Sequence, residues 1–79
     1  MMNEYEVLSK LLFEKFGKIT LDEKETAQVV GCSEKVLQKD RAEARGISYS
    51  RRNGKSRGQI MYSITAIAKH LIENQIKTI

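Results

Sequence analysis

Apolar side chains recur at helical spacing over the first sixteen residues. The positions that fall three or four apart are Tyr5, Leu8, Leu11, Leu12 and Phe16. Gly17 follows them, where a left-handed C-terminal cap is favoured. This pattern predicts a helix over residues 3–16.

Capping residues divide the next part of the chain into two helices. The stretch Thr20-Leu21-Asp22-Glu23 has the Ser/Thr-x-x-Glu form of a capping box, which predicts a helix over 21–30 that starts at Leu21. Gly31 then interrupts the pattern, and Ser33 is a good N-cap for a third helix over 33–44, closed by Gly46. Before both helices, Ile19 predicts only a very short strand.

The period of the pattern changes to two after Gly46. Apolar and polar residues alternate from Ile47 and again up to Ser63, which predicts a β-hairpin over about 47–63. Asn53-Gly54 is a two-residue turn motif, whereas Gly58 permits a wider loop that brings Tyr49 closer to Tyr62. Both registers stay open on this evidence.

A final helix is predicted over residues 64–77. Its apolar stripe consists of Ile64, Ile67, Ala68, Leu71, Ile72 and Ile76. The whole chain is therefore expected to be mainly α with a small β-hairpin, an α+β fold in one domain over residues 1–79. The order of helix, short strand, helix, turn, helix, strand, wing, strand and helix is that of a winged helix-turn-helix.

Positive charge is concentrated in one third of the chain. The formal net charge is +4, and residues 33–58 hold eight cations and three anions, while the rest holds six cations and seven anions. Such concentration favours a polyanionic partner. Its densest part is RRNGKSRG at 51–58, which either hairpin register places at the tip.

Few side chains offer other chemistry. A single cysteine, Cys32, rules out an internal disulfide, and with a single histidine, His70, nothing approaches metal-ligand spacing. Because no pair of catalytic groups lies at suitable spacing, we expect no enzyme, no catalytic residues, no metal and no cofactor. The sequence shows no signal-peptide pattern and no apolar run that would span a membrane. We therefore expect a cytoplasmic protein that makes no membrane contact.

The helix predicted over 33–44 supplies candidate base-reading residues. With Leu37 at the centre of its buried side and 100° per residue, the outward side chains are Lys35, Gln38, Lys39 and Ala42. Lysine can donate to guanine, glutamine can pair bidentately with adenine, and alanine can contact a thymine methyl.

A second group of residues is expected at the DNA backbone. It consists of Ser33, Arg41, Arg45, Arg51, Arg52, Asn53, Lys55 and Arg57. Flexible cations close to a loop tip suit phosphate contact better than base readout. An arginine at such a tip could also enter the minor groove.

Residues 11–74 resemble the small winged-helix regulators related to the MerR DNA-binding domain. These include phage and transposon excisionases, AlpA-type activators and pyocin-activator-type proteins. The matching segments are the helix start Thr20–Glu23, the turn Gly31–Ser33, the apolar pair Val36–Leu37 and the basic wing Arg51–Arg57.

The resemblance implies an accessory DNA-binding protein, bacterial or phage-encoded and associated with the nucleoid. Such a protein is an excisionase-like architectural factor that assists an integrase or other recombinase, or a small regulator of transcription by RNA polymerase in a phage or mobile element. Neighbouring copies can associate on adjacent sites. Gln38 and Lys39 replace the arginine-tyrosine pair usual in MerR-type recognition helices, so the base preference of that family is not carried over.

Two other functions remain open. A winged helix can serve as a protein-interaction module, here with a basic face for an acidic partner. Tyr49 and Tyr62 could stack on unpaired bases of RNA or single-stranded DNA, or could simply pack the hairpin onto the core.

Overall fold

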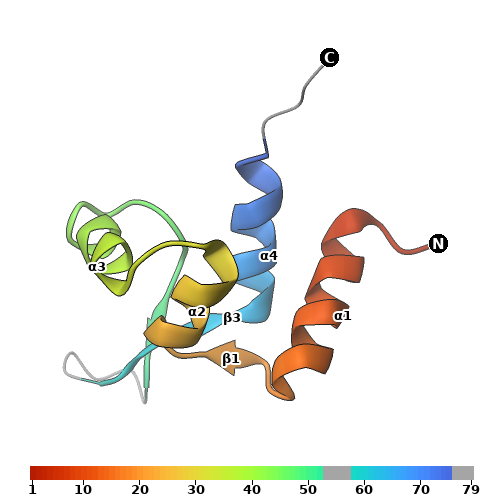
Figure 1. The fold of residues 1–79 in the computed structure, drawn as a ribbon, viewed down its shortest axis with the longest axis horizontal. Helices are drawn as coiled ribbons and strands as arrows, with labels where there is room; N and C mark the ends of the chain where they lie inside the picture. The colour runs from red at the N-terminus through yellow and green to blue at the C-terminus, as the bar shows by residue number, and fades with distance from the viewer. Residues whose placement is uncertain (53–57, 76–79) are drawn as a thin grey trace.

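Helices dominate the structure, and a small antiparallel sheet lies at one end of them (Figure 1). A computed structural model of the chain describes residues 1–52 and 58–75. Within these ranges the elements are α1 (Glu4–Phe16), β1 (Thr20–Leu21), α2 (Glu23–Val30), α3 (Glu34–Ala42), β2 (Ser50–Arg51), β3 (Ile60–Ser63) and α4 (Ile64–Glu73). The expected α+β class is confirmed.

The short strand before α2 joins the predicted hairpin, so that the sheet has three strands in the order β1-β3-β2. Thr20 and Leu21 are paired with β3 and are therefore not helical, which makes the predicted start of α2 wrong by two residues. Asp22 is the N-cap instead. Its Oδ1 accepts the N–H of Glu25 at 2.8 Å, and Glu25 Oε1 accepts the N–H of Asp22 at 3.1 Å. The capping box is thus present, two residues after the predicted one.

The register of the hairpin is that of the wider loop. Ser50 pairs with Met61 and Arg51 with Ile60, and the N–H of Arg52 donates to the carbonyl of Gln59 at 2.9 Å. The predicted span of 47–63 is correspondingly too long for the first strand, since residues 47–49 are not part of the sheet. Asn53-Gly54 lies outside the described residues.

The helix α3 is shorter than predicted. It begins after the N-cap Ser33 and ends at Ala42, two residues before the expected end. The chain then turns sharply, with positive φ angles of 54° at Ala44 and 86° at Gly46. This turn directs Ile47 into the core. A side chain at position 46 would be strained by its φ, and its Cβ would lie 3.0 Å from Asp40 Cβ.

The end of α4 also differs from the prediction of 64–77. The helix ends at Glu73, where the N–H of Asn74 donates to the carbonyl of His70 at 3.1 Å. Residues 76 and 77 of the predicted helix lie outside the described residues.

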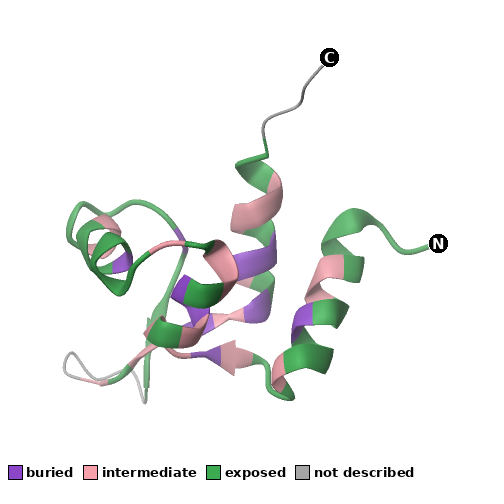
Figure 2. Ribbon diagram, viewed as in Figure 1, coloured by how far each residue is buried: buried purple, intermediate pink, exposed green. Residues whose placement is uncertain are grey.

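Every helix contributes to one small core (Figure 2). The buried apolar residues are Leu12, Leu21, Ala27, Leu37, Ile47, Tyr62, Ile64, Ile67 and Ala68. The contribution of α3 is a single side chain, Leu37, which is 3% exposed. The attachment of α3 to the rest of the molecule therefore depends on very few groups.

Three side chains of the predicted apolar positions are more exposed than expected. On α1, Leu12 is buried, whereas Tyr5 and Leu11 lie on the outer surface because α1 packs along only one side, against α4. On α3, Val36 is 46% exposed although its neighbour Leu37 is buried. A step of 100° between neighbours turns Val36 away from the core.

We expect Leu37→Ala to lower the free energy of unfolding by about 2 to 5 kcal/mol, because a cavity would replace the main apolar anchor of α3. Val36→Ala removes an aliphatic side chain one residue away but from an exposed site, and should cost less than about 0.5 kcal/mol. Urea denaturation followed by circular dichroism measures both. Equal losses for the two variants would show that α3 is not anchored by Leu37.

We also expect the acid stability of the fold to depend on Glu25. A hydrogen bond from Lys18, at 2.9 Å, and the N–H of Asp22 hold the pKa of Glu25 below its ordinary value. A carboxyl group with a lowered folded-state pKa stabilises the fold above its unfolded pKa of about 4.5. That stabilisation is lost as the pH falls through the folded-state value.

Glu25→Gln should therefore lower the free energy of unfolding at pH 7 and flatten its decrease below about pH 4.5. Denaturant titrations between pH 7 and about pH 3 give the two curves. Glu14→Gln is the control, since it removes a carboxylate that is 57% exposed and 4.0 Å from its lysine. The idea is wrong if Glu14→Gln flattens the curve as much as Glu25→Gln.

Candidate nucleic-acid interface

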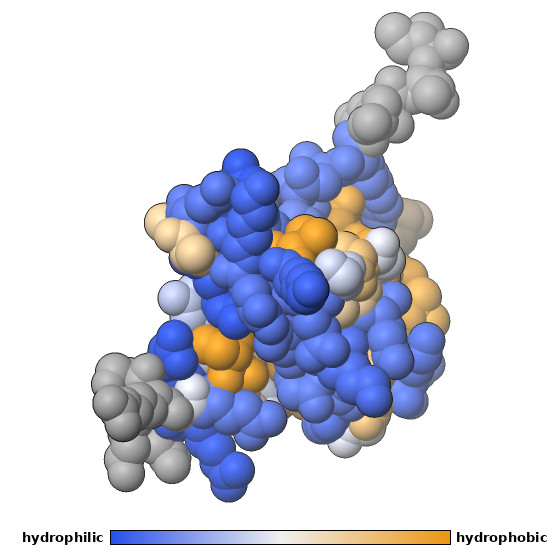
Figure 3. Space-filling model, turned by 60° about the vertical axis from the view of Figure 1, so that its left-hand side comes forward, coloured by the Kyte–Doolittle hydropathy of each residue, from blue (hydrophilic) through white to orange (hydrophobic). Residues whose placement is uncertain are grey.

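The outward face of α3 carries all four predicted base-reading residues. Lys35, Gln38, Lys39 and Ala42 are exposed on this helix, opposite the buried Leu37. The helix is oriented by a three-residue turn after α2, in which Gly31 has a φ of 81° and Ser33 caps α3. This side of the molecule is largely hydrophilic, with small apolar areas between the polar ones (Figure 3).

The hairpin lies on the same side of the molecule as α3 (Figure 1). Arg51 and Arg52 are exposed at its described end. The NH1 group of Arg51 donates to the carbonyl of Gly58 at 3.2 Å, which links the two arms of the hairpin across the loop. The predicted backbone contacts Asn53, Lys55 and Arg57 lie outside the described residues.

Arg41 has an internal position rather than the surface position expected of a backbone contact. Its side chain is 15% exposed, and its NH1 group donates to Glu23 Oε1 at 2.8 Å and to the hydroxyl of Tyr62 at 2.7 Å. Its guanidinium also lies 5.8 Å from the centre of the Tyr49 ring. A phosphate would have to displace these partners, so Arg41 is better described as a link between α2, α3 and the sheet.

Burial and hydrogen bonding have opposite effects on the pKa values of Arg41 and Tyr62. Burial tends to lower the pKa of Arg41, but its hydrogen bonds to Tyr62 and Glu23 outweigh that effect and raise it. Burial raises the pKa of Tyr62, against the opposing effect of Arg41. The guanidinium therefore stays charged and the phenol stays neutral at physiological pH.

The two tyrosines have different exposures. Tyr62 is 1% exposed and lies in the core, so it is not placed to stack on a base. Tyr49 is 44% exposed, and its ring centre is 6.4 Å from that of Tyr62. The pair mainly packs the chain before β2 against β3.

Two further predicted backbone contacts have partners within the protein. Arg45 is 60% exposed and forms ion pairs with Asp40, at 3.2 Å, and with Glu43, at 2.7 Å. Exposed pairs of this kind contribute little to stability, so Arg45 can exchange them for a phosphate. Ser33 Oγ accepts the N–H of Val36 at 3.3 Å and thus serves as the cap of α3.

Acidic groups lie in the depression between α3 and the hairpin. Asp22, Glu23 and Glu34 line it together with Lys24, Gln59 and Ile60. Arg41 neutralises Glu23, whereas Glu34 is exposed at the start of α3. The distribution of charge along the sequence does not reveal this feature, because these carboxylates come from segments that only the fold brings together.

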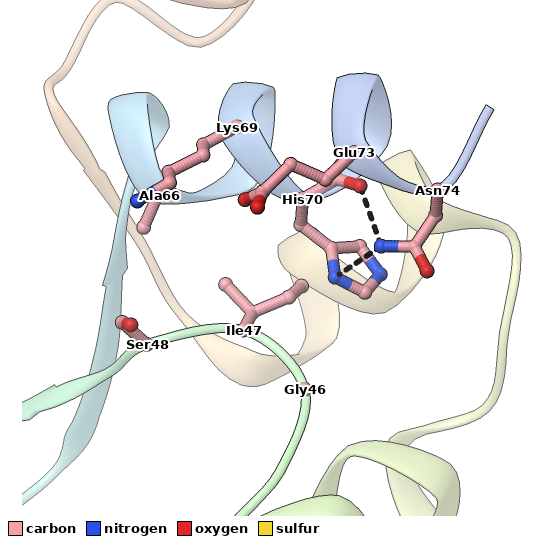
Figure 4. A pocket seen from close by; sticks show the side chains of 8 residues that line it. All are labelled: Gly46, Ile47, Ser48, Ala66, Lys69, His70, Glu73 and Asn74. Atoms are coloured by element: carbon pink, nitrogen blue, oxygen red, sulfur yellow. Dashed lines mark hydrogen bonds between the residues drawn. The ribbon is translucent and has the colours of Figure 1, made fainter.

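A separate pocket of about 430 Å³ lies between residues 46–48 and α4 (Figure 4). The His70 ring faces it, and Asn74 Nδ2 lies 3.2 Å from His70 Nδ1 while donating to the His70 carbonyl at 2.7 Å. This histidine is therefore part of the C-terminal cap of α4. Cys32 is half-buried, and burial raises the pKa of its thiol, so the unreactive protonated form is favoured.

The remaining predictions concern membrane contact and metal binding. Across residues 1–52 and 58–75, no helix is both long and apolar enough to cross a membrane. In the same part of the chain, no group of three or more His, Cys, Asp or Glu side chains is arranged to hold a metal ion.

Comparison of the chain with protein-family models, with curated proteins and with solved structures finds no match.

Proposed function

We propose that the protein binds double-stranded DNA as a winged helix-turn-helix, with α3 in the major groove and the β2–β3 hairpin against the neighbouring backbone. The observation that carries this proposal is that α3 and the hairpin lie on one side of the molecule (Figure 1), and that four residues on the outward face of α3 and Arg51 and Arg52 of the hairpin are exposed. A helix of this size fits the major groove, which is about 12 Å wide.

The proposed interface has two kinds of contact, one with base edges and one with phosphates. Lys35, Gln38, Lys39 and Ala42 lie where they can meet base edges, while Arg45, Arg51 and Arg52 can neutralise phosphates. Arg41 keeps its partners within the protein and makes no contact with DNA. The exposed carboxylate of Glu34 repels phosphate, and thereby keeps the backbone towards the hairpin and away from the start of α3.

The biological role that fits best is an accessory one. The resemblance to small MerR-related regulators supports an excisionase-like architectural factor or a small transcription regulator of a phage or mobile element. An integrase, a recombinase or RNA polymerase would then be the protein partner, and neighbouring copies would associate on adjacent sites. The cytoplasm of a bacterium is the matching location.

A single observation favours a second function, binding of an acidic protein. Val36 is 46% exposed on α3, next to the cationic face. An apolar centre with a polar rim is the usual arrangement of a protein-interaction site. On DNA the same side chain would meet a thymine methyl, so the measurements below distinguish the two functions.

Removing the described hairpin cations should weaken binding to every duplex alike. If Arg45, Arg51 and Arg52 neutralise three phosphates, these contacts contribute about −3 to the slope of log affinity against log salt concentration. Arg51→Ala combined with Arg52→Ala should make that slope shallower by about two. Fluorescence anisotropy with a labelled duplex, titrated at several salt concentrations, measures it.

Lys10→Ala combined with Lys15→Ala is the matched control for the hairpin variant. It removes the same charge from α1, which lies on the far side of the molecule from α3 (Figure 1). Its slope should stay within about 0.5 of the wild type, because these lysines are on the side away from the proposed interface and salt screens charges that make no direct contact. A wild-type slope near zero, or equal effects of the two double variants, would contradict the proposed interface.

Base preference should depend on α3. Selection from a random duplex library should recover a short motif with the wild type, and Lys35→Ala or Gln38→Ala should each lose preference at one position. The discrimination lost there is expected to be about 1 to 3 kcal/mol. Recovery of no motif by the wild type, together with tight binding to an acidic protein surface, would instead support the second function.

A further inference from the structure

The carboxylate of Glu23 lies between α2 and α3 and is held in place by a partly buried contact. Glu23 is the first residue of α2, and its side chain is 20% exposed. Its Oε1 accepts a hydrogen bond from Arg41 NH1 at 2.8 Å, and the same nitrogen donates to the hydroxyl of the buried Tyr62 at 2.7 Å. Because Arg41 is itself held by the buried Tyr62, the carboxylate of Glu23 has a fixed orientation.

The second oxygen of this carboxylate points to a base-reading residue. Glu23 Oε2 lies 3.5 Å from Nε2 of Gln38, a long contact between α2 and α3. The alternative orientation of the Gln38 amide would place its carbonyl oxygen beside the carboxylate, where two negative oxygens repel each other. The carboxylate therefore selects the orientation in which the NH₂ group of Gln38 faces α2.

This selection decides what Gln38 offers to DNA. With one N–H directed to Glu23, the carbonyl oxygen and the other N–H form the free edge of the amide. That edge has one acceptor and one donor, which match the N6 amino group and N7 of adenine in the major groove. Guanine presents two acceptors there and does not match.

We propose that Glu23 is a positioning residue that sets the base preference of Gln38 to adenine without touching DNA itself. Arg41 and Tyr62 support it by holding the carboxylate in place. The inference rests on the proposed binding of duplex DNA, and it adds the identity of a preferred base and the residue that determines it.

The decisive variant is Glu23→Gln, which keeps the shape of the side chain. Arg41 can donate only to the carbonyl oxygen of the new amide, so its NH₂ group would face Gln38. Gln38 must then accept with its own carbonyl oxygen, so its amide is turned over and the donor and the acceptor of its free edge exchange places. The exchanged edge no longer matches N6 and N7 of adenine in the same pose, so the adenine preference at this position should be lost.

The matched control is Glu34→Gln. Glu34 lies one turn before Gln38 on α3, but in the described part of the chain no hydrogen bond joins it to Gln38. Glu34→Gln removes the same charge as Glu23→Gln. This variant should keep the adenine preference. Glu23→Asp provides a second test, since its shorter carboxylate loses the contact with Gln38 without turning the amide over, and should weaken the preference less than Glu23→Gln does.

Selection from random duplex DNA should be carried out with the wild type, these three variants and Gln38→Ala, each shown to be folded by its thermal melt. Individual duplexes that differ only at the selected adenine then give dissociation constants. We expect the wild type to favour adenine over guanine by about tenfold or more, and Glu23→Gln to lose that preference. Other positions of the motif should be unchanged.

The possible results test the role of Glu23 and the proposed function separately. If Gln38→Ala loses the adenine preference while Glu23→Gln keeps it, Glu23 does not set the amide and the inference is wrong, although the proposed function stands. A change of the same kind in Glu34→Gln would indicate a general charge effect and would also overturn it. If the wild type selects no motif, base reading by α3 fails, and the inference fails with it.

Discussion

The hydrogen bonds of Arg41 are the interaction on which the arrangement of this protein depends most. A single nitrogen of its guanidinium joins Glu23 at the start of α2 to Tyr62 in the central strand, and so ties α3 to both. Leu37 is the single side chain of α3 that is buried in the core. Without the charged link, a nine-residue helix with one apolar anchor would have little to define its orientation.

This link explains why one cation of a basic segment is not part of the basic surface. Positive charge on residues 33–58 has two uses: Arg41 neutralises a carboxylate inside the fold, whereas Lys35 and Lys39 remain exposed. A partly buried pair is worth keeping only when its remaining hydrogen bonds are satisfied, and Tyr62 accepts one of them. The charge of the segment therefore overstates the charge of the surface.

Local signals determine most element boundaries in a chain with such a small core. Asn3, Asp22, Ser33 and Ser63 each accept a backbone N–H at the start of a helix, and Gly17 and Gly31 end helices in the left-handed conformation. These interactions span only a few residues and can be recognised in a sequence. The wrong start for α2 arose because Thr20 has the properties of a cap but is used in β1.

By itself, the sequence determined the four helices, the hairpin, the α+β class and the outward face of α3, because periodicity and caps act between near neighbours. Tertiary structure alone decided the wider register of the hairpin, the early end of α3, the exposure of Val36 and the internal position of Arg41. It also placed Glu23 beside Gln38, fifteen residues away. Each of these depends on contacts between segments far apart in the chain, and the packing of such segments cannot be read from the spacing of residues along it.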